Sequence, residues 1–262
     1  MNNKTESEIF NKAAAYYDKY RPSYPQEIID ILISESGVSK GSSLLEIGAG
    51  SGKATLQFAD KGFDMLCIEP GEDLVRIGNE RFKNDSIKFL SGRFEQILLP
   101  EESFDLVFAA QSFHWIPQPE GFKKCYDILK PIGSLAIIYN MYIVEDNEQD
   151  RELLSLSNKH GGFADFVTLE QSDERIKLIC SDIKNSKKFN AVKVFKKNWI
   201  KEYTADEYYG FVLTGNKILQ KNENEKAQIY TDIKCLADKF GGKIKRPYLC
   251  VLYIAKKRAT TL

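Results

Sequence analysis

Short apolar runs alternate with amphipathic stretches through the middle of the chain, between residues 44 and 140. The apolar runs predict five strands, at SLLEIG, FDMLCIE, IKFLSG, FDLVFAA and SLAIIYN. Between them, KATLQFADKG, EDLVRIGNERF and EGFKKCYDILKPIG have the apolar spacing of helices. Because strands that alternate with helices are joined by right-handed crossovers, this order predicts an α/β protein with a mostly parallel sheet.

The segments on either side of this core have a different pattern. Upstream, FNKAAAYYDKYRPSYPQEIIDILISESG predicts two helices separated by a bend at Pro22 and Pro25. Downstream, residues 145–188 are polar and are predicted to be helical, without clear strands. Two further strands are predicted at KVFKKNWIKEY and YLCVLYIAK. Between these strands, Thr204 and Glu207 form a capping box that predicts the start of a helix.

Composition narrows the class of protein. The 262 residues carry 37 basic and 37 acidic side chains, which argues against a dedicated nucleic-acid or membrane-surface protein. A polar N-terminus and the lack of a long apolar run predict a cytoplasmic protein. The five cysteines have no metal-ligand spacing, so we expect reduced thiols and no metal site. The lysine-rich run around Trp199 is expected to be a solvated face rather than a nucleic-acid groove.

A glycine-rich turn, LLEIGAGSGKAT, follows the first predicted strand. Glycines allow a ligand to approach the backbone closely, since they have no side chain to block it. A P-loop would need a glycine five residues before Gly52 and a hydroxyl after Lys53, but Ile47 and Ala54 stand at those positions. A dinucleotide-binding turn would need its third glycine one residue later than Gly52.

S-adenosylmethionine fits this turn better than a phosphate ligand. It carries an ammonium and a sulfonium cation, which Glu46 at the strand end can face directly or through water. Glu69 ends the second strand about 20 residues after the glycines, where an acid accepts hydrogen bonds from ribose hydroxyls. A turn that only packs strand on helix, and a Glu69 that is only a surface acid, remain open as alternatives.

At these motifs the chain resembles the class I S-adenosylmethionine-dependent methyltransferases, in particular the methyltransferase type 11 group. The resemblance is carried by LLEIGAGSGKAT, CIEPGEDLV, SGRFEQILLPEESFDLVFAAQSFHWI and LKPIGSLAI. YYDKYRPSYP and RPYLCVLYIAKK are similar to segments of a trans-aconitate-methyltransferase-like subgroup. The resemblance implies a Rossmann-like seven-stranded sheet whose last strand is antiparallel.

The family pattern also implies the organisation of the chain and its function. We expect one domain with an N-terminal helical lid over 1–40, a cofactor-binding core over 41–140, a helical substrate lid over 145–190 and C-terminal elements over 191–262. The expected activity is in-line transfer of a methyl group from S-adenosylmethionine to a small molecule, by a monomer or homodimer. A protein that binds this cofactor without catalysis, or an NAD-linked oxidoreductase, is the alternative.

The cofactor-binding residues that the resemblance implies lie in the turn, at the strand ends and in the lid: Tyr17, Arg21, Glu46, Gly48, Ala49, Gly50, Gly52, Glu69, Pro70, Phe94, Glu95, Gln111 and Ser112. Glu69 would hold the ribose, and Phe94 would lie beside the adenine. Many relatives carry an acid where this chain has Arg93, so Glu95 is the alternative acid for the adenine amino group.

Two histidines and one arginine complete the set of candidates. His114 follows the fourth strand, at the sheet end where the cofactor's methyl group should point, and is a candidate general base; a structural role in the loop is the alternative. Arg21 could recognise a substrate carboxylate, although packing and a surface ion pair would also explain it. His160 is expected to be an exposed loop residue.

Overall fold

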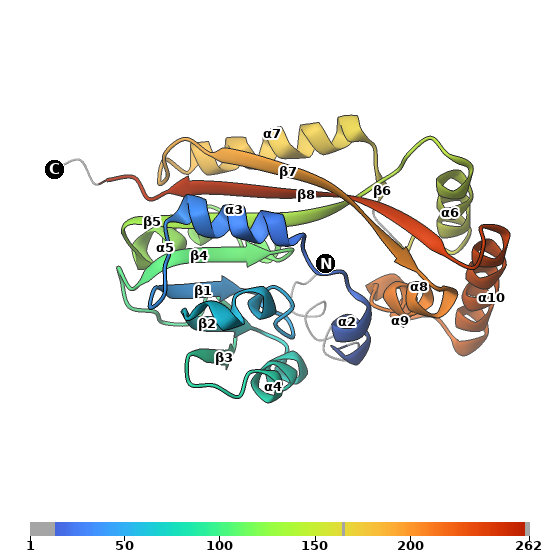
Figure 1. The fold of residues 1–262 in the computed structure, drawn as a ribbon, viewed down its shortest axis with the longest axis horizontal. Helices are drawn as coiled ribbons and strands as arrows, with labels where there is room; N and C mark the ends of the chain where they lie inside the picture. Colours follow the sequence, from blue (N-terminus) through green and yellow to red (C-terminus); the bar gives the residue numbers. More distant parts are fainter. Residues whose placement is uncertain (1–13, 164–165, 260–262) are drawn as a thin grey trace. The chain divides into compact units, whose positions relative to one another are not determined.

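A computed structural model describes residues 14–163 and 166–259. Seven strands form a sheet in the order β3-β2-β1-β4-β5-β8-β7, and the short strand β6 pairs with β5. The strand bounds are β1 Ser43–Ile47, β2 Asp64–Glu69, β3 Ile87–Ser91, β4 Phe104–Ala110, β5 Leu129–Ile143, β6 Phe166–Val167, β7 Lys193–Tyr203 and β8 Ile244–Lys256. Strands β1 to β5 pair in parallel, whereas β7 and β8 run antiparallel to each other (Figure 1). The predicted fold class is therefore confirmed.

The chain divides into two compact units, and the division falls within β5, β7 and β8. The unit that we call the core unit comprises Ser23–Asn140, Arg175–Lys197 and Cys250–Leu262. The other, which we call the aromatic unit, comprises Met1–Pro22, Met141–Glu174 and Asn198–Leu249. Both units combine segments that are distant in the sequence, whereas the predicted segments were continuous; the expectation of one domain stays a prediction.

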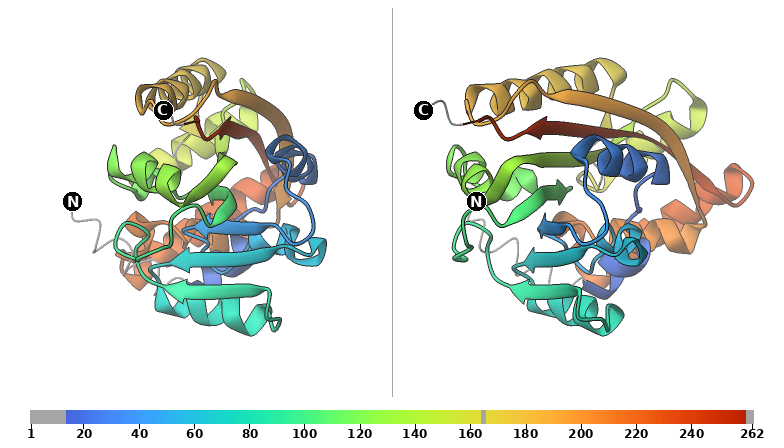
Figure 2. Two further views of the ribbon diagram at one scale, coloured as in Figure 1. Left: turned by 90° about the vertical axis from the view of Figure 1, so that its left-hand side faces the viewer. Right: turned by 60° about the vertical axis from the view of Figure 1, so that its left-hand side comes forward.

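The core unit is built around the parallel strands, of which β1 and β4 are almost entirely buried. Its helices are α3 Gln26–Ser36, α4 Glu72–Arg81 and α5 Glu120–Ile128, together with most of α7 Leu169–Asn185. Each helix buries an apolar face, as Ile28, Ile29 and Leu32 do in α3. Helix α4 packs against β2 and β3 (Figure 2). Because β1 and β4 are buried on both faces, their apolar runs are nearly continuous, whereas the edge strand β3 alternates between buried and exposed positions.

The aromatic unit contains α2 Ala14–Tyr20, α6 Glu148–Lys159, α8 Ala205–Val212, α9 Asn216–Leu219 and α10 Glu223–Lys239. Its core is a cluster rich in tyrosine and phenylalanine, including Tyr142, Tyr203, Tyr208, Phe211 and Tyr248. The predicted capping box is present: the Thr204 hydroxyl accepts from the backbone N–H of Glu207, and the Glu207 carboxylate accepts from that of Thr204. This cap fixes where α8 begins.

The helix predicted over residues 53–62 is wrong. The structure has two 3₁₀ turns instead, Thr55–Gln57 and Ala59–Lys61, and the chain turns away at Gly62, whose φ is 76°. Two side chains are held by partners outside the segment. The Thr55 hydroxyl donates to Glu46, and the Gln57 amide donates to the carbonyl of Tyr24 at 2.9 Å. We infer that these tertiary contacts override the helix propensity of the segment.

Candidate functional site

The glycine turn lies directly after β1, beside the end of β2. Glu46 stands opposite Cys67 in the parallel register of the two strands. The backbone N–H groups of Gly48 and Ala49 both donate to the carbonyl oxygen of Ile68, at 2.8 and 3.1 Å. These two bonds hold the start of the turn against the end of β2, so the position of the turn is set by the sheet.

Two of the three glycines are required, because their φ angles are positive and because a Cβ atom would clash with a neighbouring side chain. Gly48 has φ of 65°, and a Cβ atom there would lie 2.4 Å from Cβ of Ser112. The Ser112 side chain is not free to move away, because its hydroxyl donates a hydrogen bond to the carbonyl of Ile47. Gly52 has φ of 87°, and its Cβ would lie 2.5 Å from the ring of Phe82. The turn therefore has a structural reason for its glycines that is independent of any ligand.

Glu69 is buried at the end of β2, and its two carboxylate oxygens bind backbone N–H groups. Oε2 accepts from Gly50 at 2.9 Å, and Oε1 accepts from Gly71 at 2.9 Å. Burial raises the pKa of this carboxyl above its usual value, and the two backbone hydrogen bonds oppose that shift. Each oxygen accepts one bond here and has lone-pair capacity for a second donor. The predicted ribose acid is thus held in a fixed orientation beside the glycine turn, which argues against the surface-acid alternative.

Glu46 is also buried, with 1% of its surface exposed. Its Oε2 accepts a hydrogen bond from the Thr55 hydroxyl at 2.5 Å. Burial raises the pKa of Glu46 to about 8; the Thr55 bond opposes this, and the nearby Glu69 carboxylate adds to it. At neutral pH the group is therefore mostly protonated in the ligand-free protein, and a cation beside it would favour its ionised form.

This pair of buried acids is the feature that selects between ligands. A diphosphate placed at the turn would add negative charge beside Glu46 and Glu69, whose ionised forms repel one another. The 3₁₀ turns after the glycines also lack the long helix dipole that attracts phosphate at a helix N-terminus. A ligand that carries cations and ribose hydroxyls matches both carboxyl groups, so the residues present fit S-adenosylmethionine.

The end of β4 is held by the side-chain amides of Gln111 and Asn140. Gln111 has φ of 62°, and its side chain accepts from the backbone N–H of Asn140 at 2.9 Å and donates to the carbonyl of Asn140 at 3.1 Å. The Asn140 side chain in turn donates to the carbonyl of Ser23 at 3.0 Å. The Ser23 hydroxyl donates to Gln57 at 3.1 Å. The predicted site residue Gln111 is thus tied to the proline-marked bend before α3.

His114 lies in a short 3₁₀ turn after β4, Phe113–Trp115. Its ring lies 4.7 Å from the Trp115 ring and 5.8 Å from the Tyr139 ring, between centroids. The backbone of His114 also hydrogen-bonds to the Tyr139 hydroxyl. Although the residue is exposed, partial desolvation by the surrounding protein lowers the pKa of its imidazole. The ring is therefore neutral at physiological pH and able to accept a proton.

The residues predicted to lie near the adenine follow β3. Phe94 is buried, and its carbonyl oxygen accepts from the Lys124 ammonium. Arg93 and Glu95 form an ion pair at 3.7 Å. Glu95 is therefore engaged by the arginine that replaces the expected acid, and its predicted contact with the adenine stays a prediction.

Tyr17 and Arg21 belong to the aromatic unit, in α2 and directly after it. The Arg21 guanidinium donates to the Thr214 hydroxyl at 2.8 Å and to the Tyr142 hydroxyl at 3.1 Å. It also lies over the Tyr17 ring, 5.3 Å from the centroid. Arg21 is thus engaged within its own unit, and the predicted contacts of both residues with cofactor or substrate stay predictions.

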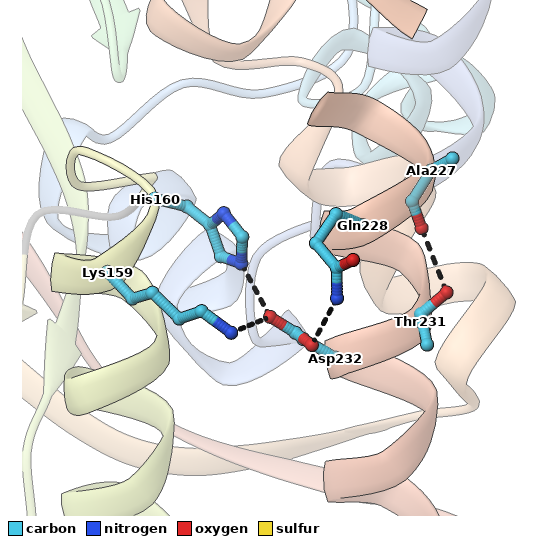
Figure 3. Close-up of polar contacts among 6 residues, drawn as sticks. All are labelled: Lys159, His160, Ala227, Gln228, Thr231 and Asp232. Atoms are coloured by element: carbon cyan, nitrogen blue, oxygen red, sulfur yellow. Dashed lines mark hydrogen bonds and ion pairs between the residues drawn. The ribbon is translucent and has the colours of Figure 1, made fainter. Parts of the chain in front are cut away.

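His160 is not the exposed loop residue that the sequence suggested. It follows α6, is half-buried, and its Nε2 lies 2.8 Å from Oδ2 of Asp232 in α10 (Figure 3). Lys159 pairs with the same oxygen at 2.6 Å, and Gln228 donates to the other at 2.9 Å. These partners lower the pKa of Asp232 to about 2 against the opposing effect of burial. The cluster joins α6 to α10, which is a structural role.

Sequence reasoning missed Thr55, Gln57 and Asn140. Each makes a side-chain hydrogen bond in or beside the glycine turn or the end of β4, as described above. No motif marks them, because their partners are fixed by strand register and chain path. In the basic run, Lys193 and Lys197 pair with Glu35 and Glu27, and the expectation of a solvated face stays a prediction.

Sheet order and turn together define a Rossmann-like α/β protein. A family described as the methyltransferase domain matches residues 45–137. An uncharacterised methyltransferase of Staphylococcus carnosus is 32% identical over 55% of this chain and 72% of its own length. An uncharacterised methyltransferase of Schizosaccharomyces pombe is 35% identical over 50% of this chain and 52% of its own. The chain belongs to the class I S-adenosylmethionine-dependent methyltransferases.

Structural similarity extends further along the chain than sequence similarity does. The phosphoethanolamine N-methyltransferase 2 of Haemonchus contortus, solved with S-adenosyl-L-methionine, superposes with a TM-score of 0.54. That match is 17% identical and covers 94% of this chain and 57% of the other, so it establishes the fold alone. The chain spans about half the length of several curated relatives that it matches.

Within 14–163 and 166–259, every helix is too short or too polar to span a lipid bilayer. The same ranges hold no group of three or more His, Cys, Asp or Glu side chains placed to bind a metal ion.

Proposed function

We propose that the protein transfers a methyl group from S-adenosylmethionine to a small-molecule acceptor. The observation that carries the proposal is the pair of buried carboxyl groups, Glu46 and Glu69, on either side of the glycine turn. Family membership supports it, since the matched family is named for methyltransferase activity. A trans-aconitate-methyltransferase-like specificity remains part of the proposal and rests on the quoted N- and C-terminal segments.

In this proposal the chain binds the cofactor through the turn and the ends of β1, β2 and β4. Glu46 faces the cationic methionyl part, and Glu69 accepts from the ribose hydroxyls. When bound, S-adenosylmethionine supplies a methyl group that its positive sulfur has already activated. The remaining task of the chain is to align the acceptor with that methyl group and to exclude water, and alignment of this kind contributes roughly 7–11 kcal/mol.

The test is methyl transfer itself. The purified chain is incubated with cofactor that carries a labelled methyl group and with fractionated metabolite pools, and label is sought in new products. The proposal expects label in at least one small molecule. Binding of S-adenosylhomocysteine without label transfer to any pool would instead support a binding protein without catalysis.

Changing Glu69 to Gln is expected to weaken binding of S-adenosylhomocysteine by about 10- to 100-fold. The reason is that a carboxylate accepts two ribose hydroxyls more strongly than an amide, and hydrogen bonds to charged groups contribute about 1.5–3 kcal/mol. Isothermal calorimetry measures the change. The matched control is Glu80→Gln, an exposed acid paired with Arg76 in α4, which should bind as the wild type does. Equal affinity of the E69Q and E80Q variants would remove Glu69 from the ribose site.

Changing His114 to Ala is expected to lower kcat by about 100-fold if the acceptor arrives protonated, because general bases contribute about 10² to 10⁴. Affinity for S-adenosylhomocysteine should stay unchanged. In the wild type, kcat should rise with pH through a pKa below the ordinary histidine value and then reach a plateau. The other histidine, His160, provides the control, since H160A should leave kcat unaltered. An H114A variant with wild-type turnover would assign His114 to loop structure only.

A further inference from the structure

A buried arginine in the aromatic unit has no hydrogen-bond partner among the described residues. Arg246 lies in β8 with 0% of its surface exposed. Within the described ranges, its Nε, Nη1 and Nη2 atoms all lack an acceptor. A guanidinium carries five N–H donors and stays charged in proteins, so this is the most under-satisfied polar group of the unit. Removing such a charge from water is costly unless a partner compensates for it.

The surroundings of Arg246 compensate for its charge only in part. The guanidinium lies over the Phe166 ring at 4.3 Å and over the Tyr142 ring at 5.6 Å, measured to the centroids. The nearby acid is Asp150, which forms no ion pair with Arg246 within the described residues. Its carboxylate instead accepts from the backbone N–H of Glu145 at 2.7 Å. The face of an aromatic ring attracts the positive charge of a guanidinium. It does not accept hydrogen bonds from the N–H groups, which point outward in the guanidinium plane.

A second unpartnered group lies near Arg246. The hydroxyl of Tyr208 in α8 is buried and also lacks a hydrogen-bond partner in the described part of the chain. It lies close enough to Arg246 and Asp150 for both to affect its pKa, which burial raises to about 12. Other polar groups nearby are satisfied: the hydroxyls of Tyr203 and Tyr248 bond to each other at 2.7 Å. In the described part of the aromatic unit, the buried side-chain donors without a partner are thus those of Arg246 and Tyr208.

We propose that the aromatic unit contains a binding site for a small-molecule carboxylate, with Arg246 and Tyr208 as its hydrogen-bond donors. A carboxylate suits this site because its planar pair of oxygens matches the fork of a guanidinium and can also accept from a phenol. Negative charge also suits it, because the two cations Arg21 and Arg246 outnumber the one acid, Asp150, among the groups named here. The aromatic rings around the guanidinium would cover the apolar part of such a ligand. This proposal does not depend on the cofactor or on methyl transfer.

Thermal unfolding of the full chain, without cofactor, tests the site with malonate as the probe. Malonamide and inorganic phosphate are compared with it at constant ionic strength. Malonate is expected to raise the melting temperature in a saturable way, and the two comparison compounds are not. An equal response to malonamide, a stronger response to phosphate, or no response to malonate would overturn the proposal.

Variants assign the response to residues. Arg246→Met should raise the half-saturating malonate concentration at least tenfold, whereas the exposed Arg151→Met, which loses only a pair with Asp146, should not. Without ligand, R246M should melt at or above the wild-type temperature, because an uncompensated buried charge is removed. A clearly lower melting temperature would show that the guanidinium stabilises the empty fold and would overturn the proposal. Tyr208→Phe, which keeps the ring, should weaken the malonate response without lowering the melting temperature.

Discussion

Replacing Gly48 with alanine is expected to destabilise the protein by about 2–5 kcal/mol. Two costs add at this position. An alanine in the left-handed region costs roughly 1–2 kcal/mol. Its Cβ would also lie 2.4 Å from Cβ of Ser112, and overpacking of this kind costs about 1–3 kcal/mol. Urea denaturation of both proteins measures the difference in the free energy of unfolding.

Gly41 is the matched control for this prediction. Its φ is 85°, but nothing lies within 4 Å of a Cβ atom there, so G41A carries the conformational cost alone. A double variant, G48A with Ser112→Gly, should recover the steric part of the loss. If G48A is no more destabilising than G41A, the tight contact between the turn and the end of β4 is wrong.

Changing Glu46 to Gln is expected to have opposite effects on stability and on cofactor binding. The pKa of Glu46 is about 8 in the folded protein and 4.5 without the fold, so the folded state binds more protons between these values. Stability contributed by this group is therefore full below pH 4.5 and falls as the pH rises towards 8, by up to roughly 5 kcal/mol. The amide variant has no such dependence and should be more stable than the wild type at pH 8.5.

Cofactor binding should change in the other direction. A cation at the turn stabilises ionised Glu46, so affinity for S-adenosylmethionine should rise by up to about tenfold per pH unit below pH 8. In the E46Q variant this pH dependence should disappear, and affinity at pH 8 should be at least roughly tenfold lower than that of the wild type. Calorimetry at pH 6, 7 and 8 on both proteins tests the pair of effects. A wild-type affinity that is the same at all three values would contradict the assigned role of Glu46.

The sequence predicted the elements whose signal is local. The buried strands were visible as apolar runs, and the start of α8 was visible from the pair Thr204 and Glu207. The segment after the glycine turn was predicted incorrectly, because its 3₁₀ geometry depends on Glu46 and Tyr24, which lie elsewhere in the chain. Such partners cannot be read from local propensity.

The candidate site likewise contains residues that the sequence predicted and residues that it did not, because their partners are distant in the chain. Glu46 and Glu69 were predicted from their positions at strand ends, and the structure places both beside the turn. The bonds of Asn140 to the carbonyl of Ser23 and to Gln111 join residues up to 117 positions apart. The buried charge of Arg246 was also invisible in the sequence, because an arginine in a strand is ordinarily expected to reach solvent.

The identity of the bound ligand tests the central claim most directly. Calorimetric titration of the wild-type chain with S-adenosylmethionine, S-adenosylhomocysteine and NAD, under one set of conditions, compares cationic and diphosphate ligands at the same turn. We expect both sulfur-containing nucleosides to bind with a stoichiometry near one, and NAD to give no measurable heat of binding. Saturable binding of NAD together with no binding of either nucleoside would contradict the account.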